Sequence, residues 1–198
     1  MFNFKMELIR ALREKRISIS TDTVKNEFWD AYMHKCLRTH KGNKEKCCKL
    51  RLEYADTMHY LFGSHESLDA HCQSSRIVTF ESRTLTFVPS LIDSSVSTKL
   101  QQCDACLTMA CAWQNSDSVS VVIDLTDVTS EFLRDIMART TKYDIVHGIR
   151  LWTTLPCKYD SIHIMKPHNT PMLSTLIAIA TRALPRKLRM RVTTETPK

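Results

Sequence analysis

The sequence predicts an α/β fold in which a small N-terminal helical lobe precedes a mixed, largely parallel sheet flanked by helices. Up to residue 60 the apolar residues recur only at helical spacing, whereas from Arg76 onward short apolar strands alternate with helical patterns. Strands that alternate with helices imply parallel pairing through right-handed crossovers. A polar connection over residues 60–75, rich in His, Ser and Asp, separates the two parts.

The first part of the chain contains only helical patterns. Apolar residues at helical spacing predict helices near residues 6–12, over 27–37 and over 44–59, with Asn43 as the N-cap of the third. These helices make up the lobe, which we place at residues 1–62.

The second part, residues 75–198, begins with two strands at 77–80 and 84–88, followed by a helix over 96–113. The run 119–125 is β-branched and nearly continuous, so it predicts an interior strand buried on both faces. Two helices, a strand and an apolar helix follow, at 131–139, 143–155, 161–165 and 172–184.

The apolar helix near the end of the chain is the least ordinary element. Thr170 can cap it, and Pro171 suits its first position because the missing N–H has no partner there. A helix with so little polar surface must be covered on most sides. It is either a core helix or a lid over an apolar cavity. After Pro185, basic and apolar residues alternate, which predicts a last strand over 187–192 with one basic face.

The formal charge of +7 is unevenly distributed. Residues 1–60 carry 13 basic and 8 acidic side chains, residues 61–155 carry 7 and 11, and residues 156–198 carry 8 and 2. A localised positive surface suits anionic lipid headgroups or nucleic acid. No segment has the length of a membrane span and the first residues lack a signal-peptide core. We therefore expect a cytoplasmic protein with reduced cysteines and possible peripheral membrane association.

The residues that could bind a metal or carry out catalysis fit packing or turn positions better than they fit an active site. Cys103 and Cys106 have the CxxC spacing of a zinc or redox site, but no second ligand pair has matching spacing. Cys157 is not followed by a Cys-x5-Arg phosphate loop, and Asp124 suits a cap or turn acceptor for residues 126–129. The chain has three glycines and no phosphate-binding glycine motif. We predict no enzyme, no catalytic residue, no metal and no cofactor.

Three stretches carry a family resemblance: residues 28–58, residues 119–125 ending in Asp124-Leu125, and residues 162–188 beginning with Ile162-His163-Ile164. On these stretches the chain resembles the CRAL-TRIO lipid-binding family, the group of alpha-tocopherol transfer protein and cellular retinaldehyde-binding protein. The resemblance covers about residues 5–192. The helix and Leu-Pro-x-Glu-Tyr-Gly-Gly segment that end the family's domain have no counterpart before Lys198. The resemblance therefore implies a domain shortened at its C-terminus.

What the resemblance implies is a non-enzymatic, monomeric carrier of one lipophilic molecule, such as a lipid, retinoid, tocopherol or carotenoid. The ligand would lie between the sheet and the apolar helix, which would act as a mobile gate. The implied ligand-binding residues are Val119, Val121, Ile123, Leu151, Ile162, Met172, Leu173, Leu176 and Ile177. The residues implied to bind anionic lipids, including phosphoinositides, are Lys158, Lys187, Arg189 and Arg191.

Two other interpretations stay open at this point. The same apolar residues are those expected in an ordinary core, so the pocket can be collapsed and the domain can serve as a protein-interaction or membrane-surface module. A nucleic-acid binder rests on charge alone, because basic residues are not interleaved with stacking aromatic residues. We therefore predict no nucleic-acid partner.

Overall fold

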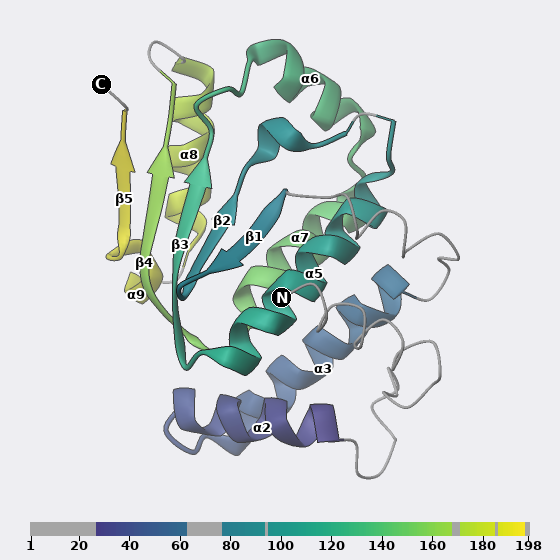
Figure 1. The fold of residues 1–198 in the computed structure, drawn as a ribbon, viewed down its shortest axis with the longest axis vertical. Helices are drawn as coiled ribbons and strands as arrows, with labels where there is room; N and C mark the ends of the chain where they lie inside the picture. The colour runs from purple at the N-terminus through teal and green to yellow at the C-terminus, as the bar shows by residue number, and fades with distance from the viewer. Residues whose placement is uncertain (1–26, 63–76, 94, 168–170, 185, 197–198) are drawn as a thin grey trace.

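The computed structural model describes residues 27–62, 77–93, 95–167, 171–184 and 186–196 (Figure 1). The helix expected near residues 6–12 and most of the 60–75 connection lie outside these ranges. The described helices are α2 (Glu27–Thr39), α3 (Lys44–Phe62), the short 3-10 helix η1 (Pro89–Leu91), α5 (Thr98–Asn115), α6 (Ser130–Arg139), α7 (Lys142–Thr153), α8 (Pro171–Ala183) and α9 (Arg186–Arg189). The described strands are β1 (Val78–Glu81), β2 (Thr84–Phe87), β3 (Ser118–Asp124), β4 (Lys158–Met165) and β5 (Val192–Glu195).

The strands form one five-stranded sheet in the order β1-β2-β3-β4-β5. β1 and β2 pair antiparallel, and the three remaining pairs are parallel. The hairpin turn between β1 and β2 consists of Ser82 and Arg83, whose φ angles are 46° and 67°. Two turn residues in the left-handed region match the right-handed twist of the flanking strands. The predicted α/β class, the largely parallel sheet and the interior position of β3 are confirmed.

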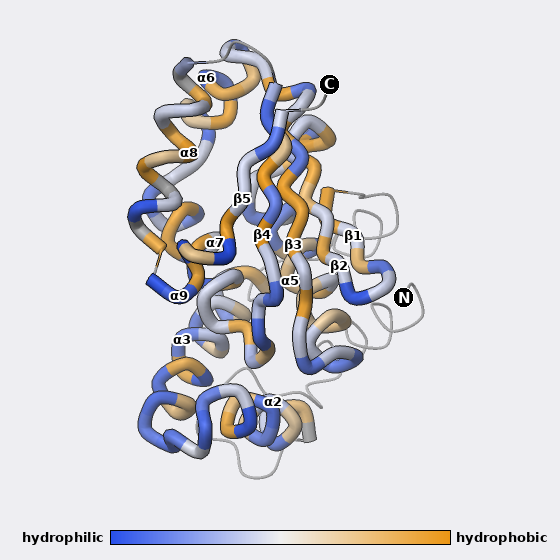
Figure 2. Tube along the Cα trace, turned by 90° about the vertical axis from the view of Figure 1, so that its left-hand side faces the viewer, coloured by the Kyte–Doolittle hydropathy of each residue, from blue (hydrophilic) through white to orange (hydrophobic). Residues whose placement is uncertain are grey.

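Only one face of the sheet is deeply buried, which corrects the expectation that β3 is buried on both faces. Val119 and Val121 have exposed fractions of 0% and 1%, whereas Ser120 and Val122, which alternate with them, are half-buried. The second face carries polar pairs: the Ser161 hydroxyl donates to Ser120 Oγ over 3.1 Å. In Figure 2 the strands stand in front of α5, with α6, α8 and α9 beside them. A run of β-branched residues therefore predicted the strand, but its neighbours decided which face is covered.

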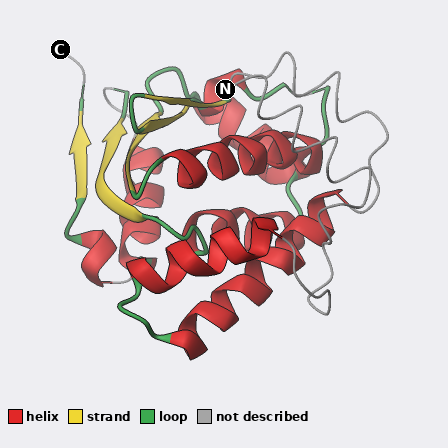
Figure 3. Cartoon of the chain, turned by 60° about the horizontal axis from the view of Figure 1, so that its bottom comes forward, coloured by secondary structure: helices red, strands yellow, loops and turns green. Residues whose placement is uncertain are grey.

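α5 lies at the centre of the helical layer, and its second half is buried on every side. Each residue from 106 to 113 is buried. The Cys103 and Cys106 side chains belong to this core, as packing predicted. Among the described residues no group of His, Cys, Asp and Glu is arranged to hold a metal ion. Figure 3 shows the strands at one edge of the molecule and the helices stacked beside them.

The helices of the lobe pack into the same core through an aromatic cluster, which we define as Phe28, Trp29, Tyr32, Tyr54 and Trp113. The Tyr32 and Tyr54 rings are stacked with centroids 5.2 Å apart, and the Phe28 and Trp113 rings meet edge to face at 5.3 Å. Such contacts add to the stabilisation that comes from burial alone. The Tyr32 hydroxyl also donates to the carbonyl of Thr154, the C-cap residue of α7. The aromatic cluster thus binds the lobe to the sheet domain.

The strand expected over 187–192 is wrong in position. Residues 186–189 form one helical turn, closed by the Met190 N–H donating to the Arg186 carbonyl over 3.1 Å. β5 begins only at Val192, which pairs with Ile162 of β4. Leu188 packs against the core while Met190 is 79% exposed. Alternation in so short a segment is compatible with a helical turn, and pairing with β4 decided where the strand starts.

The apolar helix α8 is 13 residues long, and no helix among the described residues has the length and apolar character to cross a membrane. Leu173 faces the interior with an exposed fraction of 4%, but Ile179 is 59% exposed. The helix is therefore covered on fewer sides than its composition predicted.

Candidate functional site

A cavity of about 340 Å³ lies between the β1–β2 hairpin and helices α5, α6 and α7. Helices α5 and α7 each contribute one face at helical spacing, and α6 contributes Ile136. The apolar lining residues are Ile77, Val78, Phe87, Ile92, Ala105, Ile136, Ile145, Ile149, Leu151 and Trp152. The polar and small lining residues are Thr98, Gln101, Gln102, Thr140, Asp144 and Gly148.

The inner wall of the cavity belongs to the core. Val78 and Leu151 line it with exposed fractions of 1% and 2%. The rings of Phe87 and Trp152 close another side, with centroids 6.3 Å apart and planes tilted by 55°. Apolar walls of this kind hold a hydrocarbon without any unpaired polar group to desolvate.

The outer side of the cavity is an apolar mouth on α7. Ile145 and Ile149 line the cavity, yet they are 52% and 58% exposed. Met137, beside the lining residue Ile136 on α6, is 65% exposed. Large aliphatic side chains at an opening are costly in water and favourable beside a lipophilic ligand or another apolar surface.

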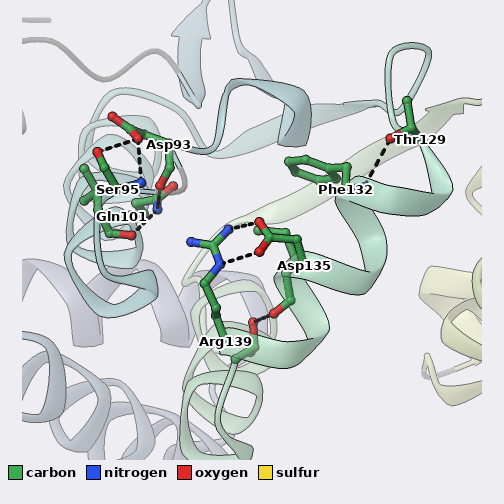
Figure 4. A network of polar contacts seen from close by, with 10 residues as sticks. Asp93, Ser95, Gln101, Thr129, Phe132, Asp135 and Arg139 are labelled. Atoms are coloured by element: carbon green, nitrogen blue, oxygen red, sulfur yellow. Dashed lines mark hydrogen bonds and ion pairs between the residues drawn. The ribbon is translucent and has the colours of Figure 1, made fainter.

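One end of the cavity is polar and rigidly held. The Gln101 side-chain NH₂ donates to the carbonyls of Asp93 and Val96, each over 2.9 Å. Figure 4 shows Gln101 beside Asp93 and Ser95, and the Ser95 N–H donates to the Asp93 carboxylate over 2.8 Å. The Gln102 NH₂ donates to the Asp144 carbonyl over 2.8 Å, which links α5 to α7.

Asp144 is used structurally. Its carboxylate accepts from the Thr141 N–H at 2.9 Å in a capping box at the start of α7, and from the Tyr60 hydroxyl at 2.9 Å. Burial opposes ionisation, but the hydrogen bonds from Thr141 and Tyr60 outweigh it and lower the pKa of Asp144. A carboxylate held ionised by hydrogen bonds from its own chain is a poor candidate for acid–base catalysis.

A second polar cluster joins α3 to the opposite side of α7. The Tyr60 ring stacks on His147 with centroids 4.1 Å apart. Thr57 donates to the Glu53 carbonyl over 3.0 Å, so its oxygen accepts from His147 Nδ1, 3.2 Å away. Burial lowers the pKa of His147, and it is opposed by the charge of Asp56. This cluster holds the cavity wall against the lobe.

The structure brings one of the nine ligand-binding residues implied by the resemblance, Leu151, to this cavity. Val119, Val121 and Ile162 are core residues, and Ile123 and Ile177 pack against that core. Leu173 is buried, Leu176 is 36% exposed, and the Met172 side chain lies outside the described part of the structure. Their role in ligand binding stays a prediction.

One signal for this cavity is present in the sequence, although the family resemblance points elsewhere. Thr98, Gln101, Gln102 and Ala105 follow helical spacing and put small or polar residues on one face of a helix that is otherwise deeply buried. That face is the one that borders the cavity.

The four basic residues implied to bind anionic lipids are all exposed. Two of them also have structural partners. The Arg189 guanidinium donates to the carbonyls of Arg182 and Leu184 over 2.7 and 3.2 Å, and the Arg191 guanidinium donates to the Tyr159 carbonyl. Arg189 thus satisfies carbonyl groups at the end of α8. Lys158 begins β4, and Lys187 lies on α9.

Cys157 and Asp124, the two residues considered for catalysis, serve packing and turn formation. Burial raises the pKa of the Cys157 thiol to about 12, so the nucleophilic thiolate is disfavoured. The Asp124 carboxylate accepts from the N–H and the hydroxyl of Thr126 over 3.0 and 2.6 Å. The predicted turn role of Asp124 is therefore confirmed.

Comparison with known proteins supports the fold. No protein-family model matches the chain, and no curated protein sequence matches it. Among solved structures, the chain is similar to Sfh5, a Sec14-family or CRAL-TRIO protein, with a TM-score of 0.53 and 9% identity. The match covers 97% of this chain and 78% of Sfh5. At this identity the likeness shows a Sec14-like fold and nothing finer.

Proposed function

We propose that this protein binds and transfers one small lipophilic molecule without catalysis, and that the cavity between α5, α6, α7 and the β1–β2 hairpin holds it. The observation that carries the proposal is the cavity itself: about 340 Å³, apolar on most sides, and lined by the exposed Ile145 and Ile149. This volume falls in the lower part of the range of about 300–1,000 Å³ typical of small-molecule sites. The Sec14-like fold supports the same function.

The driving force would be burial of hydrocarbon. Each buried methylene contributes about 0.8 kcal/mol, so a chain of about eight methylenes supplies about 6 kcal/mol before the cost of ordering the ligand. The exposed side chains at the mouth become covered in the same event.

Substitution at Ala105 tests the site. Ala105 lines the cavity, whereas Ala138 is exposed on α6 and does not line it. Native mass spectrometry of protein purified from a eukaryotic host should show a retained lipophilic mass in the parent and in Ala138→Trp, and its loss in Ala105→Trp. A parent that retains nothing, or an Ala105→Trp variant that retains as much as the parent, contradicts the proposal.

We further propose that exposed basic residues at α9 attract anionic membrane lipids. Arg182, Arg186, Lys187 and Arg189 lie at the end of α8 and on α9, and Arg191 follows them. Each basic residue near an anionic surface contributes about 1 kcal/mol, and salt screens the effect. In Figure 1, α9 lies at the edge of the sheet near β4 and β5, away from α6. Membrane attraction and ligand entry would thus use different parts of the surface.

Vesicle sedimentation at low and high salt tests the basic face. Vesicles with phosphatidylserine or a phosphoinositide should bind the protein, and neutral vesicles should bind it weakly. Lys187→Gln combined with Arg186→Gln should reduce anionic binding tenfold or more without removing the hydrogen bonds of Arg189. Arg134→Gln, an exposed position on α6, is the control. Equal binding by the parent and the double variant contradicts this role.

A second candidate is an interaction module with a filled pocket beneath α8. Leu173 is 4% exposed and Ile177 packs against the core, so these residues are occupied by internal contacts. A partner with an apolar surface would then cover Ile145 and Ile149. The Ala105→Trp variant separates the two functions, because filling the cavity leaves the outer surface of α7 in place.

A further inference from the structure

The connection between α2 and α3 carries a dense positive charge on the surface of the lobe. Its basic residues, which we call the basic turn, are exposed and accompanied by one acid, Glu45: Arg38, Lys41, Lys44, Lys46 and Lys49. The backbone is fixed by a cap, because the Lys46 N–H donates to the Asn43 side-chain oxygen over 2.9 Å. Burial and then the charge of Lys46 lower the pKa of the neighbouring His40. The turn therefore presents its cations from a well-defined backbone.

Two carboxylates at the neighbouring edge of the sheet are already paired. The Asp117 carboxylate lies 2.9 Å from Arg38 Nη2 and 3.4 Å from the Lys35 ammonium. The Asp160 carboxylate lies 3.3 Å from Arg83 Nη2. Within the described ranges, none of the four lysines of the basic turn forms an ion pair. Their charges are thus available to an anionic partner.

The basic turn adjoins the basic residues around α9. The Arg38 side chain pairs with Asp117, whose carbonyl accepts from the Lys158 N–H over 3.0 Å at the start of β4. One residue further along β4, the Tyr159 carbonyl accepts from the Arg191 guanidinium, which follows α9. In Figure 1, α9 and the connection between α2 and α3 lie on the same, left-hand side of the molecule. One side of the molecule therefore carries both basic clusters.

Exposed apolar side chains accompany both clusters. Leu52 is 51% exposed and lies three residues after Lys49 and four after Cys48, so it shares their side of α3. Met190, directly after α9, is 79% exposed. Cations beside apolar side chains suit an anionic bilayer, where the cations meet headgroups and the apolar groups enter the acyl boundary. A nucleic acid backbone or an acidic peptide offers the apolar side chains no such environment.

We propose that the basic turn, together with Leu52, is a second docking site for an anionic lipid surface and binds the same bilayer as α9. This inference rests on the proposed attraction of α9 to anionic lipids and adds a surface on the N-terminal lobe. Two clusters on one packed core act as linked sites, because attachment of one raises the effective concentration of the other at the membrane. The lobe thereby contributes directly to membrane binding.

Sedimentation with phosphatidylcholine vesicles, with and without phosphatidylserine, measures the contribution of the basic turn in the full chain. Lys44→Gln combined with Lys46→Gln should weaken binding to the anionic vesicles by about tenfold or more, since each basic residue near the surface contributes about fivefold. Arg134→Gln combined with Lys142→Gln removes the same charge from exposed positions on α6 and α7 and should bind as the parent does. Leu52→Ser should weaken the part of the binding that persists at high salt. Thermal unfolding checks that each variant is folded.

A dye on Cys48 tests whether the turn itself meets the bilayer. Cys48 is exposed, whereas the other cysteines of the described ranges are buried. In a Cys72→Ser chain, a polarity-sensitive maleimide dye should therefore react at Cys48, and its emission should shift to shorter wavelength on vesicles with phosphatidylserine. The same dye at Ala138→Cys on α6, in a chain that also carries Cys48→Ser, is the control and should not shift.

The outcomes separate this inference from the proposed role of α9. Loss of binding in the basic-turn variant, but not in Lys187→Gln with Arg186→Gln, supports the inference and contradicts the role of α9. The reverse result contradicts the inference and leaves the role of α9 in place. If both variants bind anionic vesicles as the parent does, both are wrong. If the dye on Cys48 does not respond, or the basic-turn variant loses affinity only for a polyglutamate or RNA oligomer, the turn is not a lipid-docking site.

Discussion

The two halves of α5 border regions that are filled very differently. Around the second half, each residue from 106 to 113 is buried, and the aromatic cluster closes on Trp113. Around the first half, Gln101, Gln102 and Ala105 face a cavity of about 340 Å³. One helix thus borders a packed region, which we call the base, along its second half and an open site along its first half. Rings from α2 and α3 fill the base, whereas small and polar side chains opposite Gly148 leave space at the other end.

The difference indicates that the packed end of α5 stabilises the fold and that the open end provides the candidate binding site. A cavity costs stability, because the lining side chains lose contacts. The aromatic cluster buries large rings and ties the lobe to the sheet, which offsets such a loss elsewhere in the same core. Substitutions at the two ends of α5 should therefore have different consequences.

The largest effect is expected from removing an aromatic ring of the base. Trp113→Ala should lower the free energy of unfolding by about 3–5 kcal/mol, because Trp113 is 0% exposed and its loss leaves a large void. Trp152→Ala, at the half-buried cavity wall, should cost clearly less. Urea unfolding measures both. Equal losses in the free energy of unfolding would show that the two ends of α5 are packed alike, which would contradict the comparison.

Enlarging an alanine should have opposite effects at the two ends of the helix. Ala110→Leu at the packed end should destabilise by about 1–3 kcal/mol through overpacking. Ala105→Leu fills space in the cavity, so it should be neutral or stabilise by about 1 kcal/mol. The same unfolding experiment compares them. A destabilising Ala105→Leu would mean that the cavity is smaller in solution.

A smaller effect is expected from pH at the junction of the two regions, where His147 joins α7 to α3. Burial lowers its pKa from 6.5, supported by Arg150 and Lys99 and opposed by Asp56 and Asp144. The unfolded chain therefore binds a proton more readily than the folded one as the pH falls below 6.5. The contribution of His147 to the free energy of unfolding should be fully present above pH 6.5 and should decrease below it.

Unfolding followed across pH 5–8 checks this dependence, and His147→Gln is the control. The variant should flatten the slope that the parent shows between pH 5 and 6.5. If the stability of the parent rises on acidification over this range, the pKa of His147 is raised by folding and the prediction is wrong.

The smallest effect is expected at the surface of the cavity wall. Arg139 and Asp135 form an i,i+4 ion pair on α6, with 2.5 Å between nitrogen and oxygen (Figure 4). Asp135→Asn should cost less than about 0.5 kcal/mol, since exposed pairs of this kind contribute little. Ligand retention should stay unchanged. A large loss of either would mean that α6 is held by this pair more than by its packing.

Much of the fold could be predicted from local patterns. The change from helical to mixed periodicity near residue 76 and the β-branched run 119–125 predicted the α/β class and the interior strand. Helical spacing predicted a helix over 143–155, close to the observed bounds of α7, Lys142–Thr153. Such signals depend on residues a few positions apart, so the sequence displays them directly.

The location of the candidate site could not be predicted in the same way. Position by position, the resemblance led to Val119 and Val121, which the structure places in the packed core. The cavity instead depends on side-chain volumes contributed by the hairpin, α5, α6 and α7, which lie far apart in the sequence. The sequence alone therefore determined which segments are helices and strands and that one helix is unusually apolar. Tertiary structure decided which face of the sheet is covered, where β5 starts and where space is left. Those outcomes depend on how side chains from distant elements fill a shared volume, which no local pattern records.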